Sequence, residues 1–148
     1  MEDKHVIATF HGAELFGVFD GHGGKDVAIY VSDNLPQALL PKFLTKERGE
    51  SADDTELERT VNGVYRELDR TMCQNGFEAG SCALVSIFDA VKKEIFVINL
   101  GDSRALLFTD ECQQLLQTLE KSPADEEEKA RIENAEHMVK IIKNVVFD

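Results

Sequence analysis

A short glycine-rich segment, Asp20-Gly21-His22-Gly23-Gly24, combines residue types that can carry chemistry. Asp20 supplies a carboxylate, and His22 supplies an imidazole that can transfer a proton near neutral pH. The glycines allow the backbone to turn tightly and to approach a ligand closely. An Asp-Gly pair is also ordinary turn chemistry, so the segment needs support from the rest of the chain.

The charge of the chain limits the partners that it can have. The 148 residues carry a formal net charge of −12, with 43% hydrophobic and 30% charged residues. This composition is typical of a soluble globular protein, and we expect a single domain over residues 1–148. The acidic balance argues against nucleic acid as the main partner, because phosphate binding needs a basic face. It also repels anionic substrates unless a cation lies between them.

The location of the protein is predicted from what the sequence lacks. The wholly apolar runs extend over only a few residues, so we expect no membrane-spanning segment and no membrane partner. The start of the chain, Met1–His5, is polar and carries both charge signs, unlike a signal peptide. We therefore expect an intracellular protein, cytoplasmic or nuclear. Cys73, Cys82 and Cys112 have no zinc-type spacing, and we expect free thiols that behave as small core residues.

Periodicity in the first part of the chain predicts a hairpin and a helix. Val6–Phe10 and Leu15–Asp20 are apolar runs of β-forming residues on either side of a short turn. A helix follows, because Val27, Val31, Leu35 and Leu39 recur every four residues. Pro36 predicts a break or kink near Leu35. Residues 41–53 lack periodicity and are interpreted as a loop.

The later part predicts a second helix and a sheet covered on both faces. Leu57, Val61, Val64, Leu68 and Met72 form a helical stripe that ends at Gly76. The runs Cys82–Phe88 and Glu94–Leu100 must pair antiparallel across a short turn. The second run hardly alternates, so we expect helices on one face of the sheet and another sheet on the other. Further elements are expected as strands over Ala105–Thr109, Gln114–Leu119 and Met138–Phe147 and as a helix that starts at Ser122–Asp125.

Several of these segments together resemble the metal-dependent serine/threonine protein phosphatases, the type 2C or PPM family. Met1–His5 resembles the acidic strand of that family, Phe16–Gly24 its signature loop, and Asn99–Ala105 its middle motif. Weaker matches follow the same order at Gly80–Ala83, where the family usually has Thr at Cys82, and from Ser122 to Ala135. The resemblance covers nearly the whole chain, but only about the first half of a family catalytic domain.

The resemblance implies a fold, a reaction and a set of site residues. The implied fold is α+β, a four-layer αββα sandwich of antiparallel sheets flanked by helices, here partial. The implied reaction is hydrolysis of phosphoserine and phosphothreonine by water activated between two Mg²⁺ or Mn²⁺ ions, which accept carboxylate, carbonyl and water ligands. The residues implied as metal ligands are Glu2, Asp20, the Gly21 carbonyl and, at a third and weaker position, Asp102. Asp3 is implied either as a further ligand or as a carboxylate next to the ligands, and His22 is implied as the general acid.

The chain also departs from the family pattern. It has no counterpart of the Arg that precedes the acidic strand and grips the phosphate, and the later Asp-Gly and Asp-Asn ligand motifs would lie beyond Asp148. Glu2, Asp3 and Asp20 therefore face two dications with too little negative charge, and we expect weak metal binding and an incomplete, inactive domain.

Three interpretations stay open on the sequence: part of a phosphoprotein phosphatase, a pseudophosphatase that acts as a non-catalytic binding or regulatory module, or a truncated product. Half of a sandwich leaves strand edges and an apolar face uncovered. We therefore also expect self-association, a protein partner, or continuation in a longer product.

Overall fold

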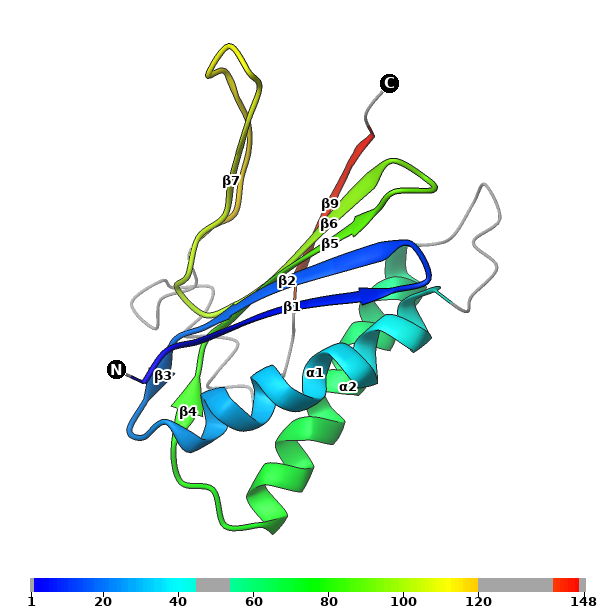
Figure 1. The fold of residues 1–148 in the computed structure, drawn as a ribbon. Coiled ribbons are helices and arrows are strands. Elements are labelled where there is room, and N and C mark those ends of the chain that lie inside the picture. Colours follow the sequence, from blue (N-terminus) through cyan, green and yellow to red (C-terminus); the bar gives the residue numbers. More distant parts are fainter. Residues whose placement is uncertain (1, 45–53, 120–139, 147–148) are drawn as a thin grey trace.

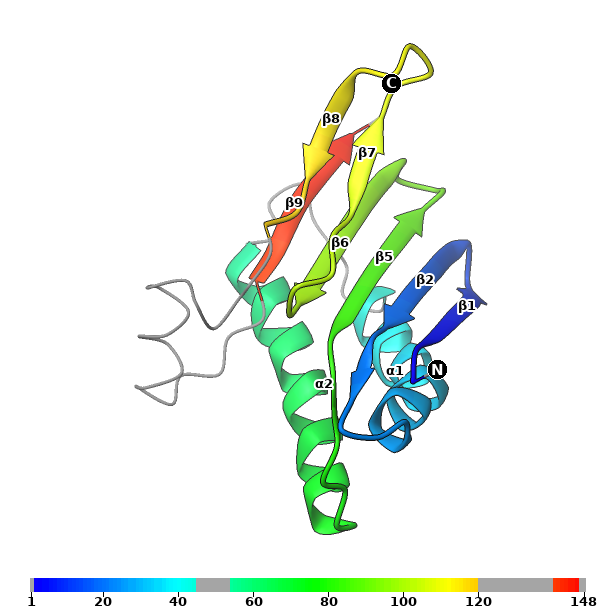
Figure 2. The ribbon, with the colours of Figure 1, turned by 90° about the vertical axis from the view of Figure 1, so that its left-hand side faces the viewer.

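The computed structural model describes residues 2–44, 54–119 and 140–146. Its centre is a five-stranded antiparallel sheet in the order β1-β2-β5-β6-β9, with two helices on one face (Figures 1 and 2). The strands of this sheet are β1 (Lys4–Phe10), β2 (Ala13–Phe19), β5 (Ala83–Asp89), β6 (Glu94–Leu100) and β9 (Lys140–Val146). The other elements are α1 (Asp26–Leu44), α2 (Asp54–Gln74) and the two-stranded ribbons β3 (Gly21–His22) with β4 (Gly80–Ser81) and β7 (Leu106–Phe108) with β8 (Gln114–Gln117).

The predicted first hairpin is confirmed, with a tighter turn than the sequence indicated. β1 and β2 pair from Phe10 opposite Ala13 to Lys4 opposite Phe19. Only His11 and Gly12 lie between the strands, and both have positive φ angles, 47° and 84°. Positive φ at both central residues is the conformation that matches the twist of a two-residue hairpin.

The second predicted strand pair is also confirmed. β5 and β6 pair antiparallel from Ala83 opposite Leu100 to Asp89 opposite Glu94. β5 alternates between buried and half-buried residues, whereas Phe96 to Asn99 of β6 are buried in succession. The expectation that β6 is covered on both faces therefore holds for its central residues.

Helix α1 corrects the predicted break at Pro36. The helix continues from Asp26 to Leu44 with Pro36 and Pro41 inside it. Residues 41–44, which were predicted as part of a loop, belong to this helix, and residues 45–53 of the predicted loop lie outside the described part. Leu35, Leu39 and Leu40 are almost completely buried, so packing on the core outweighs the backbone hydrogen bonds that the prolines remove.

Helix α2 ends as its sequence predicts, at a glycine. Gly76 has a φ of 74°, and its N–H donates to the Cys73 carbonyl at 3.1 Å. The N–H of Phe77 donates to the Met72 carbonyl, also at 3.1 Å. These two bonds form the Schellman motif, which satisfies carbonyl groups at the helix end and brings Phe77 back toward Met72.

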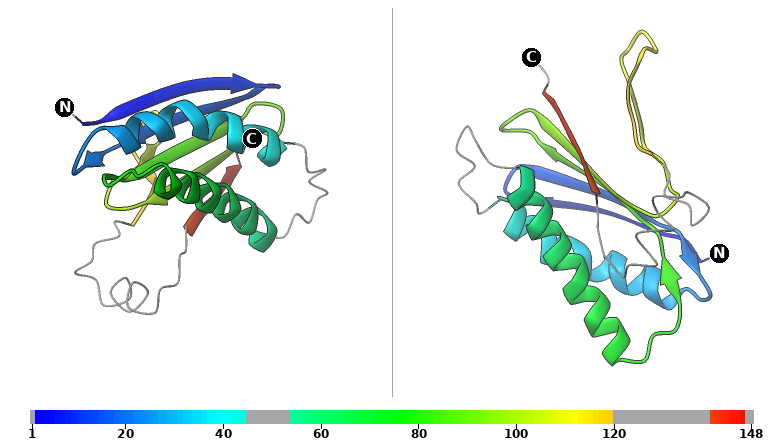
Figure 3. Two further views of the ribbon diagram at one scale, coloured as in Figure 1. Left: turned by 90° about the horizontal axis from the view of Figure 1, so that it is seen from below. Right: turned by 180° about the vertical axis from the view of Figure 1, so that it is seen from behind.

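The core lies between the helices and one face of the sheet. Phe43 of α1 meets Phe96 of β6 edge to face, with ring centroids 4.8 Å apart. Leu15, Phe19, Val85 and Ile87 of the sheet are fully buried beneath the helices. Both helices lie on this side in all views, while the hairpin β7–β8 lies on the opposite side of the sheet (Figures 1 and 3). The α+β class and the antiparallel pairing are thus confirmed.

On the face of the sheet turned away from the helices, the part formed by β1 and β2 is apolar and open in the described residues. Ile7 is 68% exposed, Phe16 43% and Val18 50%. Ile7 pairs directly with Phe16, and Val18 pairs with half-buried Leu84. We call Ile7, Phe16, Val18 and Leu84 the outer-face patch.

Among the described ranges, neither helix combines the length and apolar character that crossing a bilayer requires.

The four elements predicted for the last part of the chain have different outcomes. Strands are found at β7, β8 and β9, within the expected ranges, whereas the helix expected from Ser122–Asp125 lies outside the described residues.

The Nδ2 group of Asn99 donates to the carbonyls of Ser103, at 2.9 Å, and of Leu119, at 3.2 Å. A buried side chain of β6 therefore fixes both ends of the hairpin segment.

Tyr65 of α2 carries a buried hydroxyl that has no hydrogen-bond partner in the described part of the chain. A buried polar group without a partner loses its hydration and gains nothing in return. We expect Tyr65→Phe to raise the free energy of unfolding by about 1 kcal/mol, measured by urea denaturation. Tyr30→Phe is the matched control, because the Tyr30 hydroxyl is not among the buried atoms without a partner. A loss of stability in Tyr65→Phe would contradict this account.

The same residue predicts a pH dependence. Burial raises the pKa of the Tyr65 hydroxyl above its ordinary value. Above about pH 10 the unfolded chain releases this proton while the folded chain keeps it, so stability falls as the pH rises. We expect the stability advantage of Tyr65→Phe to grow between pH 9 and pH 11, roughly the range where free tyrosine titrates. An advantage that stays constant with pH would be the contrary result.

Candidate functional site

The glycine-rich segment forms the turn that connects the sheet to helix α1. It starts at Asp20, directly after β2, and includes the short strand β3. The backbone carbonyl of Asp20 accepts the Cys82 N–H at 2.9 Å and the Ser81 hydroxyl at 3.2 Å. Because its backbone is held by these bonds, Asp20 can present its exposed carboxylate in a fixed place at the end of the sheet.

Gly21 brings the start of the chain against this turn. A Cβ atom at Gly21 would lie 2.8 Å from the Glu2 carbonyl oxygen and 3.3 Å from the Glu2 Cβ. On the opposite side it would lie 3.2 Å from the Ala28 Cβ in α1. Only glycine therefore fits between Glu2 and the helix.

Glu2 and Asp3 are exposed and lie at the same end of the sheet as Asp20. The register of the first hairpin, with Lys4 opposite Phe19, leads the preceding residues toward the turn. The expectation that strand pairing brings Glu2 or Asp3 near Asp20 agrees with this placement. Their roles as metal ligands stay predictions.

Asp102 reaches this end of the sheet from the loop after β6. The Cys82 thiol donates to Asp102 Oδ1 at 3.2 Å, while the backbone N–H of Cys82 binds the Asp20 carbonyl. Burial is the main cause that raises the pKa of the Cys82 thiol, and the carboxylates of Asp102 and Asp20 contribute in the same direction. Cys82 thus connects two of the predicted site residues.

The cysteines behave differently from the sequence expectation. All three are free, as predicted. However, Cys73 and Cys112 are exposed, and Cys82 is only partly buried instead of being a core residue. Cys82 lies at the rim of the sheet because the chain there leaves β4 and enters β5, where its thiol meets a carboxylate rather than apolar side chains.

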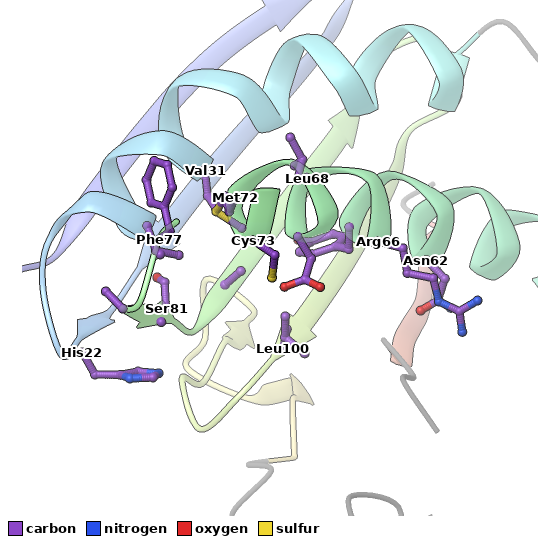
Figure 4. A pocket seen from close by; sticks show the side chains of 16 residues that line it. His22, Val31, Asn62, Arg66, Leu68, Met72, Cys73, Phe77, Ser81 and Leu100 are labelled. Atoms are coloured by element: carbon purple, nitrogen blue, oxygen red, sulfur yellow. The ribbon is translucent and has the colours of Figure 1, made fainter. Parts of the chain in front are cut away.

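His22 is exposed, and its imidazole lies close to Gly80. β3 and β4 pair with His22 opposite Gly80. A Cβ atom at Gly80 would lie 2.7 Å from His22 Nε2 and 3.1 Å from Nδ1, and still closer to Cε1. The ring can hold this place only while residue 80 has no side chain. Figure 4 shows His22 projecting beneath Ser81.

The donors at this end of the sheet have the right chemistry for a hard divalent ion, since carboxylates and carbonyls are the ligands that Mg²⁺ and Mn²⁺ prefer. Their number is the difficulty. Within residues 2–44, 54–119 and 140–146, no group of three His, Cys, Asp or Glu side chains is placed to hold a metal ion.

Comparison with known proteins agrees with this fold and this loop. The family described as protein phosphatase 2C matches residues 1–147. The chain is 34% identical over 138 residues to the probable protein phosphatase 2C 32 of Oryza sativa subsp. japonica, covering 90% of this chain and 34% of the relative. It is 33% identical over 150 residues to protein phosphatase 1B of Homo sapiens, covering 91% of this chain and 31% of that protein.

A solved structure is similar in fold. The structure of a C. elegans sex determining protein superposes with a TM-score of 0.71 at 23% identity, covering 95% of this chain and 38% of the other. Fold, loop and family match together define a phosphatase-type α+β domain. The chain belongs to the protein phosphatase 2C family. It spans about a third of the length of the curated relatives it matches.

Sequence reasoning singled out the acidic residues and His22 but missed the residues that hold them. Gly80, Ser81 and Cys82 contact His22, Asp20 and Asp102 from β4 and from the step into β5. Their order, Gly-Ser-Cys-Ala, was recognised only as a weak family match. The signal that could have found them is the small size of residues 79–83, since small residues permit close backbone approach.

The contact between Gly80 and His22 gives a testable prediction. We expect Gly80→Ala to displace the imidazole, seen as a change in the ring ¹H–¹³C NMR signals of His22 while the spectrum of the core is retained. Gly63→Ala is the matched control, because nothing lies within 4 Å of a Cβ at that helical position. Gly63→Ala should leave the His22 signals unchanged and stabilise the protein by up to about 1 kcal/mol. Unchanged His22 signals in Gly80→Ala would contradict the packing described here.

Proposed function

We propose that this chain forms the N-terminal part of a metal-dependent protein serine/threonine phosphatase. The substrate class is phosphoserine and phosphothreonine in proteins, and the cofactor is a pair of Mg²⁺ or Mn²⁺ ions. The proposal is supported by membership of the protein phosphatase 2C family over residues 1–147. The single observation that carries it at residue level is the convergence of the Asp20–Gly21–His22 turn, the Glu2 backbone and Asp102 at one end of the sheet.

The proposed roles follow from the chemistry of each group. Asp20, Glu2 and Asp3 would offer carboxylate oxygens and Gly21 its carbonyl, with Asp102 as a more distant acidic group. Divalent ions, when bound, lower the pKa of water and neutralise phosphate charge. His22 would donate a proton to the leaving alcohol, because an imidazole can be protonated near neutral pH. Gly80 would hold the His22 ring in place.

We further propose that the chain by itself binds metal weakly and lacks phosphatase activity. Two divalent ions carry four positive charges, against the three carboxylates of Glu2, Asp3 and Asp20. Mg²⁺ gives up its water ligands reluctantly, so a partial ligand set holds it poorly.

A second candidate function is a pseudophosphatase that binds another protein without catalysis. The outer-face patch would be its contact surface, because an open apolar surface on a sheet is a common protein contact. The partner that we propose is a second copy of this chain, because each copy carries the same open apolar patch. Such a contact would cover Ile7, Phe16 and Val18 on both copies.

Metal binding tests the first proposal. We expect Mn²⁺ titrated calorimetrically into the chain to bind with a dissociation constant near the millimolar range, comparable to other loose oxygen-ligand sites. Asp20→Asn should abolish the heat of binding, since it removes a central carboxylate. Asp33→Asn, at an exposed acid of α1, is the matched control and should retain it. Neither the wild-type chain nor either of the two variants should hydrolyse p-nitrophenyl phosphate with Mn²⁺ present. Micromolar affinity or robust turnover would refute the weak-site proposal.

Sedimentation velocity tests the second candidate. We expect a sedimentation coefficient that rises with protein concentration, and Phe16→Lys should remove this dependence by placing a charge in the outer-face patch. Val91→Lys is the control, because Val91 is 81% exposed in the turn after β5, outside the patch. A monomer at all concentrations would exclude self-association.

A further inference from the structure

A cavity of about 430 Å³ lies beside the turn that carries His22. It opens between the C-terminal part of α2, the start of α1 and the strand end at β4 (Figure 4). Its volume lies within the range of pockets that bind small molecules or side chains. Apolar walls are provided by Val27, Val31, Leu68, Met72, Phe77 and Ala83.

The wall of the cavity is held in place by the end of α2. The Schellman motif at Gly76 turns the chain so that Phe77 and Met72 face the same space. Tyr30 of α1 packs against Phe77 at an angle of 61°, with ring centroids 5.5 Å apart. Phe77 is therefore held both by the end of α2 and by Tyr30 of α1, so this wall of the cavity is part of the packed structure.

The cavity adjoins the candidate site at His22. His22, Gly80 and Ser81 line it, and the Ser81 hydroxyl also donates to the Asp20 carbonyl. In Figure 4, His22 lies at one end of the space while Asn62 of α2 lies toward the other. A group that contacts His22 therefore lies at one end of an apolar space.

The charges of the cavity do not suit a phosphate group. The charged residues that line it are Arg66 and Asp69 of α2 and, when protonated, His22. Arg66 and Asp69 contribute opposite charges, so they give little net attraction for a dianion. The apolar walls instead favour a hydrophobic group, whose transfer from water is favourable in proportion to the area buried.

We propose that this cavity receives an apolar side chain of the substrate, close in sequence to the phosphorylated residue. The inference rests on the proposed function, because it takes His22 as the group that meets the phosphorylated residue. An extended peptide advances by about 3.3–3.6 Å per residue, so a side chain near the phosphorylated residue reaches the space beside His22. The cavity then selects substrates by an aliphatic or aromatic neighbour of the phosphorylated residue.

Cys73 offers a direct readout of occupancy. It is exposed and lines the cavity, whereas exposed Cys112 lies in the hairpin β7–β8, outside the cavity. The test uses the 148-residue chain and measures alkylation of both thiols by iodoacetamide, followed by mass spectrometry. Two phosphoserine peptides serve as probes, identical except for Phe or Ser at the second position on either side of the phosphoserine. Unphosphorylated versions of both are included.

The expected result is that the Phe peptide slows alkylation of Cys73 at a concentration about tenfold lower than the Ser peptide requires, from the burial of one aromatic side chain. Alkylation of Cys112 in the same molecules should not change. Equal protection by the Phe and Ser peptides, or equal slowing of Cys73 and Cys112, would overturn the proposal.

The phosphorylation arm separates the two proposals. A Phe preference in both the phosphorylated and the unphosphorylated peptides supports the cavity. If phosphate and Mn²⁺ add nothing to the protection of Cys73, that result counts against the phosphatase site but leaves the cavity proposal standing. A phosphate effect without a Phe preference would overturn the cavity and leave the phosphatase site standing.

A variant confirms where the peptide binds. Met72→Gln keeps the length of the side chain but makes this wall polar, and we expect it to reduce the Phe preference about threefold or more. Ile7→Gln removes a similar apolar group from the outer-face patch and should retain the full preference. Retention of the preference in Met72→Gln, with a far-UV circular dichroism melt like that of the wild type, would contradict this location.

Discussion

The candidate site depends on the pairing of β2 with β5. These strands are separated in sequence by both helices, yet they lie side by side with Val18 opposite Leu84. Beyond the last paired residues, the Asp20 carbonyl accepts bonds from Cys82 and Ser81. One loop is thus fixed to another that lies far away in sequence. Without this pairing, Asp102 and His22 would have no common support, because each follows a different strand.

The helices supply the free energy that keeps the two strands together. Strand pairing alone is marginal in water, and an apolar face must be covered before a sheet is stable. Leu15 and Phe19 of β2 and Val85 and Ile87 of β5 are fully buried against the helical layer. The exposed Asp20 turn is therefore held by a buried core, an arrangement in which the rigid part of the fold positions groups that must meet solvent and substrate.

Much of the fold follows from local patterns in the sequence. The stripe from Leu57 to Met72 and the stop at Gly76 predicted α2, and the unbroken apolar run of β6 predicted cover on both faces. Pro36 misled the prediction, because local rules cannot weigh a lost hydrogen bond against the burial of Leu35 and Leu39. The order of strands in the sheet was also beyond reach, since pairing between distant segments leaves no local signal.

The site was predictable in its acidic residues and less so in what surrounds them. Asp20 and His22 stand out because glycines flank them, and a family resemblance drew attention to Glu2, Asp3 and Asp102. The support given by Gly80 and by the thiol of Cys82 became visible only in three dimensions. A single cysteine with no metal-binding or disulfide spacing gives no sign in the sequence that its thiol will donate a hydrogen bond to a carboxylate. The same is true of a cavity whose walls come from α1, α2 and β4.

The Asn99 side chain separates the turn that contains Asp102 from the β7–β8 hairpin that follows it in sequence. Its amide donates to the Ser103 carbonyl and so closes a small ring of backbone that contains Gly101 and Asp102. A second bond to the Leu119 carbonyl joins the returning end of β7–β8 to the same anchor. Asp102 accordingly takes its orientation from β6, not from the β7–β8 hairpin that follows it. A change in the length or charge of the β7–β8 hairpin therefore need not redirect the carboxylate beside Cys82.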